Sequence, residues 1–123
     1  MIKLVYCVRK RAELSLEAFR TYWLEQHGPL VLRFAEALRA KKYIQSHTIE
    51  PEINDALGKS RGLAPPYDGI TEVWWEDIES VKAALSSPAA QEAHQALIED
   101  EAKFIDFSQS RVFMTEEHVI FDL

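Results

Sequence analysis

The order of strand-like and helix-like segments constrains the fold of this chain most. Residues 2–8, 42–49, 68–76 and 111–114 are rich in β-branched and aromatic side chains and predict four strands. Apolar residues at helical spacing lie between the first and second of these segments and again between the third and fourth. The predicted order of elements is therefore strand, helix, strand, strand, helix, strand.

That order predicts an α+β protein of the ferredoxin-like βαββαβ class, with one antiparallel sheet and the helices on a single face. A chain of 123 residues has the usual size of one domain, so we expect a single domain over residues 1–123.

Proline marks both predicted helical regions. Ser15 is the expected N-cap of a helix that leads to His27, and Gly28-Pro29 is expected to interrupt that helix, because proline lacks the N–H and clashes with the preceding turn. Pro29 then opens a second helical segment. Ser87-Pro88 predicts the start of a long helix that runs to about Phe104.

The connection between the second and third strands contains Pro51, Gly58, Gly62 and Pro65-Pro66 and shows no internal periodicity. A loop of this length is usually functional or mobile, and the sequence leaves open whether it forms a lid.

Apolar side chains occur on both sides of the predicted sheet. In the third strand, Ile70 and Trp74 oppose Val73 and Trp75. Because helices cover one face only, the second apolar set would remain in water in a monomer. We therefore expect a homodimer that packs the open faces of two copies together.

Charge and composition exclude several classes of partner. The chain has 14 Lys+Arg against 20 Asp+Glu, and a formal charge of −6 repels phosphate backbones, so we expect no nucleic-acid partner. No apolar run approaches the ~20 residues of a membrane span, so we expect no membrane partner. The single cysteine, Cys7, fits a reducing compartment and favours a cytoplasmic location.

His27 is the first candidate for chemistry, because it stands directly before the Gly28-Pro29 break. An imidazole at a helix end can act as a general acid or base near neutral pH. The alternative is a structural histidine that bonds a freed carbonyl and closes the kink.

Glu101 is a possible buried acid. Projected at about 100° per residue, the last long helix places both Glu101 and His94 inside an apolar arc with Leu97 and Ile98. A carboxylate there needs a partner or a raised pKa. It either serves catalysis or makes a structural hydrogen bond.

Four further polar or aromatic residues are candidates for binding a substrate. Gln45 and His47 share one side of the second strand, and we expect Glu72 and Trp74 to be available to the same face. The alternative places Gln45 and His47 at an exposed strand end. The sequence has no Gly-rich phosphate loop, HExxH, CxxC or GxSxG motif, so we expect no cofactor and no metal site.

The segment from Leu14 to Leu30, which ends in His-Gly-Pro-Leu, resembles the opening signature of the EthD-domain family. Residues 43–47, 67–74 and 100–106 look like the second strand, the third strand and the helix end of that family. The resemblance implies a dimeric α/β-barrel and a functional role for His27. Similar domains in fungal aromatic polyketide pathways act as cyclases or dehydratases without a cofactor.

These observations lead to the hypothesis of a small cofactor-independent enzyme that acts on a hydrophobic or aromatic small molecule by acid/base chemistry, in a catabolic or biosynthetic pathway. His27 would be the acid/base, Gln45 and His47 would orient polar groups, and Tyr22 and Trp74 would form apolar walls. The alternatives are a non-catalytic binding or accessory protein and a cofactor-free monooxygenase.

Overall fold

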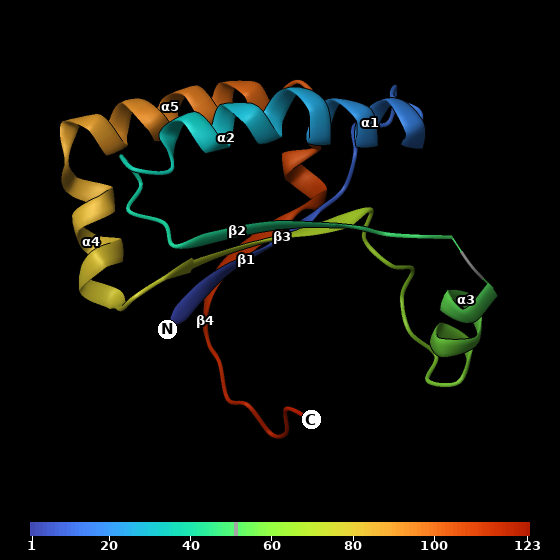
Figure 1. Ribbon diagram of the computed structural model, residues 1–123. Coiled ribbons are helices and arrows are strands. Elements are labelled where there is room, and N and C mark those ends of the chain that lie inside the picture. Colours follow the sequence, from blue (N-terminus) through green and yellow to red (C-terminus); the bar gives the residue numbers. More distant parts are fainter. Residues whose placement is uncertain (51) are drawn as a thin grey trace.

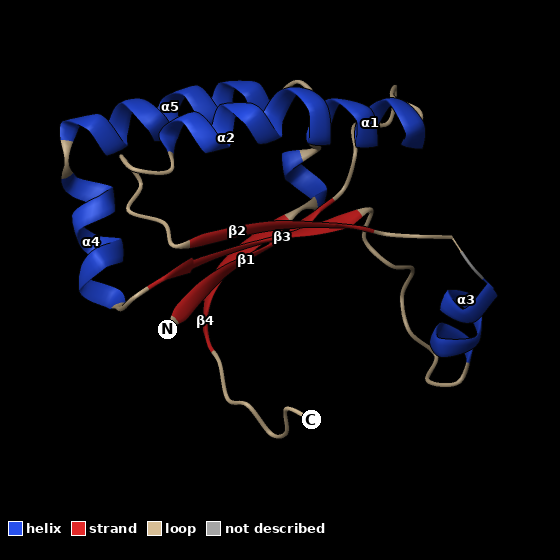
Figure 2. Ribbon diagram, in the orientation of Figure 1, coloured by secondary structure: helices blue, strands red, loops and turns tan. Residues whose placement is uncertain are grey.

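Four antiparallel strands form the sheet, in the order β2-β3-β1-β4 (Figure 2). The computed structural model describes residues 1–50 and 52–123; Pro51, which we expected in the connection between the second and third strands, lies outside the described residues. The strands are β1 (Ile2–Val8), β2 (Lys42–His47), β3 (Gly69–Trp75) and β4 (Arg111–Glu116). Their order and pairing confirm the ferredoxin-like class.

The helices lie on one face of this sheet (Figure 1). They are α1 (Leu16–Tyr22), the π-helical turn η1 (Trp23–His27), α2 (Gly28–Phe34) and α5 (Pro88–Glu101), with α4 (Ile78–Ser86) at one end of the sheet. The short 3₁₀ turn η2 (Phe107–Gln109) leads into β4. The side chains of Ser15 and Ser87 cap α1 and α5 as predicted, each accepting a backbone N–H three residues on. The long helix ends at Glu101 and not near Phe104.

The expected interruption at Gly28-Pro29 is wrong. The helix continues through η1, in which the Gly28 N–H donates to the carbonyl of Trp23 five residues earlier. A π-helical turn inserts one residue into the ladder, and such turns occur frequently at functional sites. Pro29 then occupies the first turn of α2, where no N–H is needed.

The connection between β2 and β3 contains a helix, α3 (Glu52–Lys59), which we did not predict. Ile53 and Leu57 stand four residues apart and give this segment a helical period that the surrounding glycines and prolines obscured. Both side chains are exposed. The helix α3 lies at the end of the sheet opposite α4 and extends toward the side that the other helices leave open (Figure 1).

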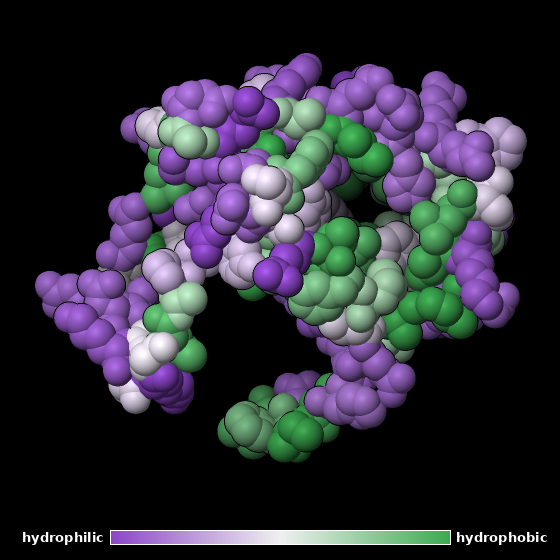
Figure 3. Space-filling model, turned by 180° about the vertical axis from the view of Figure 1, so that it is seen from behind, coloured by the Kyte–Doolittle hydropathy of each residue, from purple (hydrophilic) through white to green (hydrophobic). Residues whose placement is uncertain are grey.

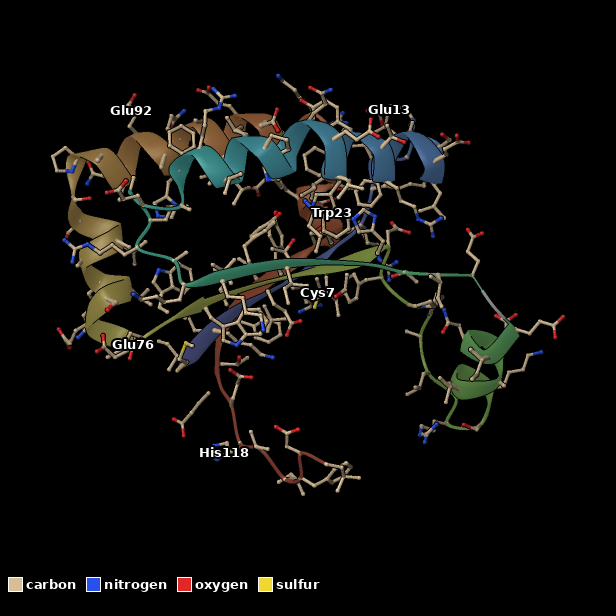
Figure 4. The ribbon with its side chains drawn as sticks, viewed as in Figure 1. Cys7, Glu13, Trp23, Glu76, Glu92 and His118 are labelled. Carbon is tan, nitrogen blue, oxygen red and sulfur yellow. The ribbon has the colours of Figure 1, made fainter. Side chains whose placement is uncertain are left out.

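The register of the strands divides the sheet into two faces. The covered face, which packs against the helices, carries Leu4, Tyr6, Tyr43, Thr71, Val73 and Trp75. The open face carries Lys3, Ile44, Ile70, Glu72, Trp74 and Phe113. In the sticks view Trp23 lies between the helices and the sheet, whereas Glu13 and Glu92 lie on the outer side (Figure 4).

Two hydrophobic clusters form the core beneath the helices. The first comprises Val8, Phe19, Trp23, Phe104 and Ile105, and the second comprises Val31, Leu38, Ala93 and Leu97. Within the described residues, no helix has the length and apolar character needed to cross a membrane.

Candidate active site

A cavity of about 580 Å³ lies between the covered face of the sheet and the helices α2 and α5. Its walls are mostly apolar and include members of both core clusters. The polar or ionisable residues in its lining are Tyr6, His27, Lys41, Lys42, Tyr43, Thr71, His94 and Glu101. A largely apolar cavity with a few convergent polar groups is typical of a small-molecule site.

His27 forms one wall of this cavity and is held by Asp100. The π-helical turn places the imidazole beside α5, where its Nδ1 lies 2.8 Å from Asp100 Oδ2. The Tyr22 hydroxyl donates to the other carboxylate oxygen of Asp100 at 2.5 Å. The ring also meets the edge of Phe104, with centroids 5.1 Å apart, and only 5% of His27 is exposed. Asp100 and Phe104 therefore fix the orientation of the imidazole.

The electrostatics of this pair favour a neutral histidine and an ionised aspartate. Burial lowers the pKa of His27 below its usual 6.5, and the hydrogen bond and charge of Asp100 offset only part of that effect. Burial opposes ionisation of Asp100, but hydrogen bonds from Tyr22 and His27 outweigh it and lower the pKa of that carboxyl. At neutral pH, His27 therefore donates its Nδ1–H to the carboxylate and keeps a lone pair on Nε2.

Glu101 enters the same cavity from the end of α5. Its pKa is raised to about 7: burial is the largest cause, a hydrogen bond from Tyr6 partly opposes it, and the neighbouring charge of Asp100 adds to it. Burial and the Glu101 carboxylate both raise the pKa of Tyr6, so the phenol keeps its proton. The cavity thus contains a carboxyl group that holds its proton up to about neutral pH.

Gln45 and His47 lie on the covered face but do not line this cavity. Gln45 Nε2 donates to the Trp23 carbonyl at 2.9 Å and to the Tyr43 hydroxyl at 3.1 Å, while its Oε1 lies 2.9 Å from His47 Nε2. The His47 ring stacks on Trp23 with centroids 4.3 Å apart. The carbonyl at the helix irregularity is therefore bonded by Gln45, whereas the imidazole of His27 bonds Asp100.

Our expectation that Glu72 and Trp74 share a face with Gln45 is wrong. In the β2–β3 register they pair with Ile44 and Lys42, and directly paired residues of an antiparallel sheet share a face, which puts both on the open face. Glu72 forms an ion pair with Lys3 at 2.6 Å.

Trp74 also has its partners on the open face. Its indole N–H donates to Glu117 at 2.6 Å, and the ammonium groups of Lys3 and Lys42 lie 5.3 Å and 4.7 Å from the ring centroid. The one-residue error in register moved both Trp74 and Glu72 to the wrong side.

Tyr22 does not form an apolar wall, because its hydroxyl bonds Asp100 outside the cavity lining. Sequence reasoning missed Asp100 and Tyr6 as site residues. The one available signal for Asp100 was its place beside Glu101 in the segment that resembles the EthD helix end.

Among the described residues, no group of three His, Cys, Asp or Glu side chains is arranged to hold a metal ion.

Comparison with known proteins identifies the family. The family model of the EthD domain matches residues 11–108. The chain belongs to the EthD family. The match begins after β1 and stops before β4, and these two strands are neighbours in the sheet. No protein with a curated description matches the sequence.

Several solved structures share the fold of this EthD protein. An ethyl tert-butyl ether D family protein from Bacillus halodurans has a TM-score of 0.63 at 16% identity, covering 96% of this chain and 99% of its own. An EthD-like protein from Ralstonia eutropha has a TM-score of 0.60 at 14% identity, with 98% and 95% covered. A dimeric ferredoxin-like protein of unknown function from Bacteroides fragilis has a TM-score of 0.58 at 9% identity, with 94% and 95% covered.

Proposed function

We propose that this EthD protein is a small cofactor-independent enzyme that transfers protons on a hydrophobic or aromatic small molecule, with His27 as the general acid/base. The observation that supports this most directly is the neutral imidazole, held by Asp100, in the wall of a mostly apolar cavity. A base with a free lone pair and a fixed ring orientation is what proton abstraction requires.

The cavity supports the choice of substrate class. A volume of about 580 Å³ lies within the range of small-molecule sites, and apolar walls favour a hydrophobic ligand. An anionic partner behind the imidazole stabilises the imidazolium that forms when His27 takes a proton. Closing the helix irregularity does not require His27, because Gln45 and the Gly28 N–H bond the Trp23 carbonyl.

A screen for binding followed by a test of conversion examines this proposal. A panel of aromatic ketones, phenols and lactones is screened by thermal shift, and the binders are incubated with the wild type, His27→Gln and His118→Gln. His118 is an exposed histidine near the C-terminus and provides the matched control (Figure 4).

We expect conversion to fall about 10²–10⁴-fold in His27→Gln at an unchanged melting temperature, and to persist in His118→Gln. A folded His27→Gln that converts the binders at the wild-type rate would exclude His27 as the acid/base. Binding without conversion by any variant would instead support the non-catalytic alternative.

We also propose that two copies pair through their open faces into a homodimer. Phe113 and Ile70 on that face are 49% and 37% exposed, and the tail after β4 exposes Val119, Ile120 and Phe121 (Figure 3). The Bacteroides fragilis relative, which shares the fold, is described as dimeric. Light scattering should give about twice the 14.1 kDa mass of the chain, and a mass near 14.1 kDa at micromolar concentration would contradict the proposal.

A cytoplasmic location remains a proposal that rests on the single cysteine.

A further inference from the structure

We infer that Glu101, assisted by Tyr6, is a second proton-transfer group in the cavity of His27, and that the substrate class is an apolar compound with a carbonyl group next to an ionisable C–H bond. This inference rests on the proposed function of His27 and extends it. It names a second catalytic residue and the functional group on which both residues act.

Two consecutive carboxyl groups at the end of α5, those of Asp100 and Glu101, point in different directions. Consecutive helical side chains diverge by about 100°, so Asp100 and Glu101 cannot face the same neighbour. Asp100 turns toward α1 and η1, where it bonds Tyr22 and His27. Glu101 lines the cavity together with Tyr6 of β1, which acts on its carboxyl group. His27 and Glu101 therefore reach one cavity from two sides, the former from η1 and the latter from α5.

The surroundings of the two carboxyl groups differ in a way that separates their roles. Asp100 has two hydrogen-bond donors and lies 3.6 Å from the ammonium group of Lys103. Glu101 makes no ion pair with a lysine, arginine or histidine among the described residues. It lies in a mostly apolar wall with a phenol as its partner. A carboxyl group in that environment favours the protonated form, whereas Asp100 stays ionised.

A neutral base and a protonated acid in one apolar cavity can enolise a carbonyl compound. His27 Nε2 takes the proton from the carbon next to the carbonyl; the C–H electron pair forms the new C=C bond, and the C=O π pair moves to oxygen. Glu101 gives its proton to that oxygen. The products are a neutral enol, an imidazolium beside Asp100 and a carboxylate that accepts the Tyr6 hydroxyl. The step needs no oxidant. In the reverse step the imidazolium returns a proton to carbon and the enol O–H returns its proton to Glu101, which restores the ketone and both residues.

Deuterium exchange into β-tetralone tests this pair without knowledge of the natural substrate. This bicyclic ketone is apolar, and its α protons exchange with D₂O through the enol. The rate is measured by proton NMR for the wild type, His27→Gln, Glu101→Gln and the control Glu99→Gln, whose exposed side chain accepts a hydrogen bond from Gln95 on the outside of α5. Circular dichroism and melting curves verify that each variant is folded.

We expect the wild type to accelerate exchange over buffer, His27→Gln to return it to the buffer rate, and Glu101→Gln to slow it at least tenfold, with Glu99→Gln unchanged. The wild-type rate should fall as the pH rises through about 7, since Glu101 then loses its proton, and Glu101→Gln should lack this descending limb. Tyr6→Phe removes the hydrogen bond that lowers the pKa of Glu101, so the limb should move to higher pH.

The outcomes separate the two proposals. Exchange that depends on His27 but is unchanged in rate and pH profile by Glu101→Gln and Tyr6→Phe would overturn the role of Glu101 and leave that of His27. Exchange that His27→Gln does not alter, or a wild type no faster than buffer, would overturn the assigned chemistry of both residues. If Glu101→Gln does not fold, the shift of the limb in Tyr6→Phe decides the role of Glu101.

Discussion

The two faces of the sheet place charged groups in contrasting environments. In the cavity over the covered face, His27 is buried and Glu101 is partly buried beside apolar walls, and burial is the largest influence on the pKa of each. On the open face, Lys3 and Glu72 form an ion pair whose side chains remain 21% and 24% exposed. There, the hydrogen bond that Lys3 donates to Glu72 is the largest influence and raises the pKa of Lys3.

Under the proposed function, this contrast gives the two faces different roles. Burial favours the uncharged form of both groups: it keeps the imidazole of His27 neutral and raises the pKa of Glu101 to about 7. A neutral base and a protonated acid suit the proposed proton transfer. Partly hydrated ion pairs contribute little to stability. They keep the surface soluble and can fix the orientation of a second copy that covers it. We therefore expect variants on the covered face to affect chemistry and folding far more than variants on the open face.

The largest effect should come from Asp100→Asn. The amide cannot stabilise the imidazolium and favours the wrong tautomer of His27, so the rate of β-tetralone exchange should fall by about 10²–10⁴-fold. Tyr22→Phe removes one donor to Asp100 and should give a smaller loss. An Asp100→Asn variant that exchanges at the wild-type rate would show that Asp100 only packs against the helix.

Gly69→Ala should cause the next largest effect, on stability. A Cβ at Gly69 would lie 2.6 Å from Trp23 Cη2 and 2.9 Å from the Ser46 carbonyl oxygen, so the helix and sheet would have to separate. We expect a loss of about 3 kcal/mol in the free energy of unfolding, measured with urea. Gly58→Ala, whose Cβ meets no atom within 4 Å, is the matched control and should be neutral or stabilising. Equal melting temperatures for the two variants would contradict the close packing of Trp23 on β3.

Glu101→Gln should change how stability depends on pH. The pKa of Glu101 is about 7 in the folded chain against 4.5 as its usual value, so the folded state holds the proton more tightly. The stability that this contributes is complete below pH 4.5 and is lost as the pH rises through about 7. The wild type should thus lose on the order of 1–3 kcal/mol across this window relative to Glu101→Gln. Parallel stability curves for both proteins would show that Glu101 is hydrated.

The smallest effect should come from Lys3→Met on the open face. The variant removes the ion pair with Glu72 but keeps an apolar side chain beside Trp74. The free energy of unfolding should change by less than about 1 kcal/mol, because partly exposed ion pairs gain little over water. A larger loss, comparable with that of Gly69→Ala, would remove the contrast between the two faces.

Local patterns were sufficient to predict much of this fold. Strands β1 to β4 and the caps Ser15 and Ser87 follow from periodicity and from residue types over short windows. The π-helical turn was missed because the proline rule predicts a break, and in this chain the Gly28 N–H bonds the carbonyl five residues back instead. That bond keeps His27 inside a continuous helix.

The candidate site was harder to predict because its contacts are distant in sequence. The sequence predicted His27 as a candidate, but its partner Asp100 lies 73 residues away, and no local period links them. Glu72 and Trp74 were placed on the wrong face, since the register between β2 and β3 depends on pairing across the sheet. Residue types indicated candidates for chemistry, whereas the tertiary fold decided which of these residues meet.

The protonation state of His27 is the most direct test of this account, and it requires no substrate. Two-dimensional NMR of the protein with ¹⁵N-labelled imidazole rings reports which ring nitrogen carries the proton and at which pH the ring becomes charged. We predict a neutral ring at neutral pH with its proton on Nδ1 toward Asp100, and a pKa below 6.5. An imidazolium at neutral pH, or a neutral ring protonated on Nε2, would contradict the assignment of His27 as the base.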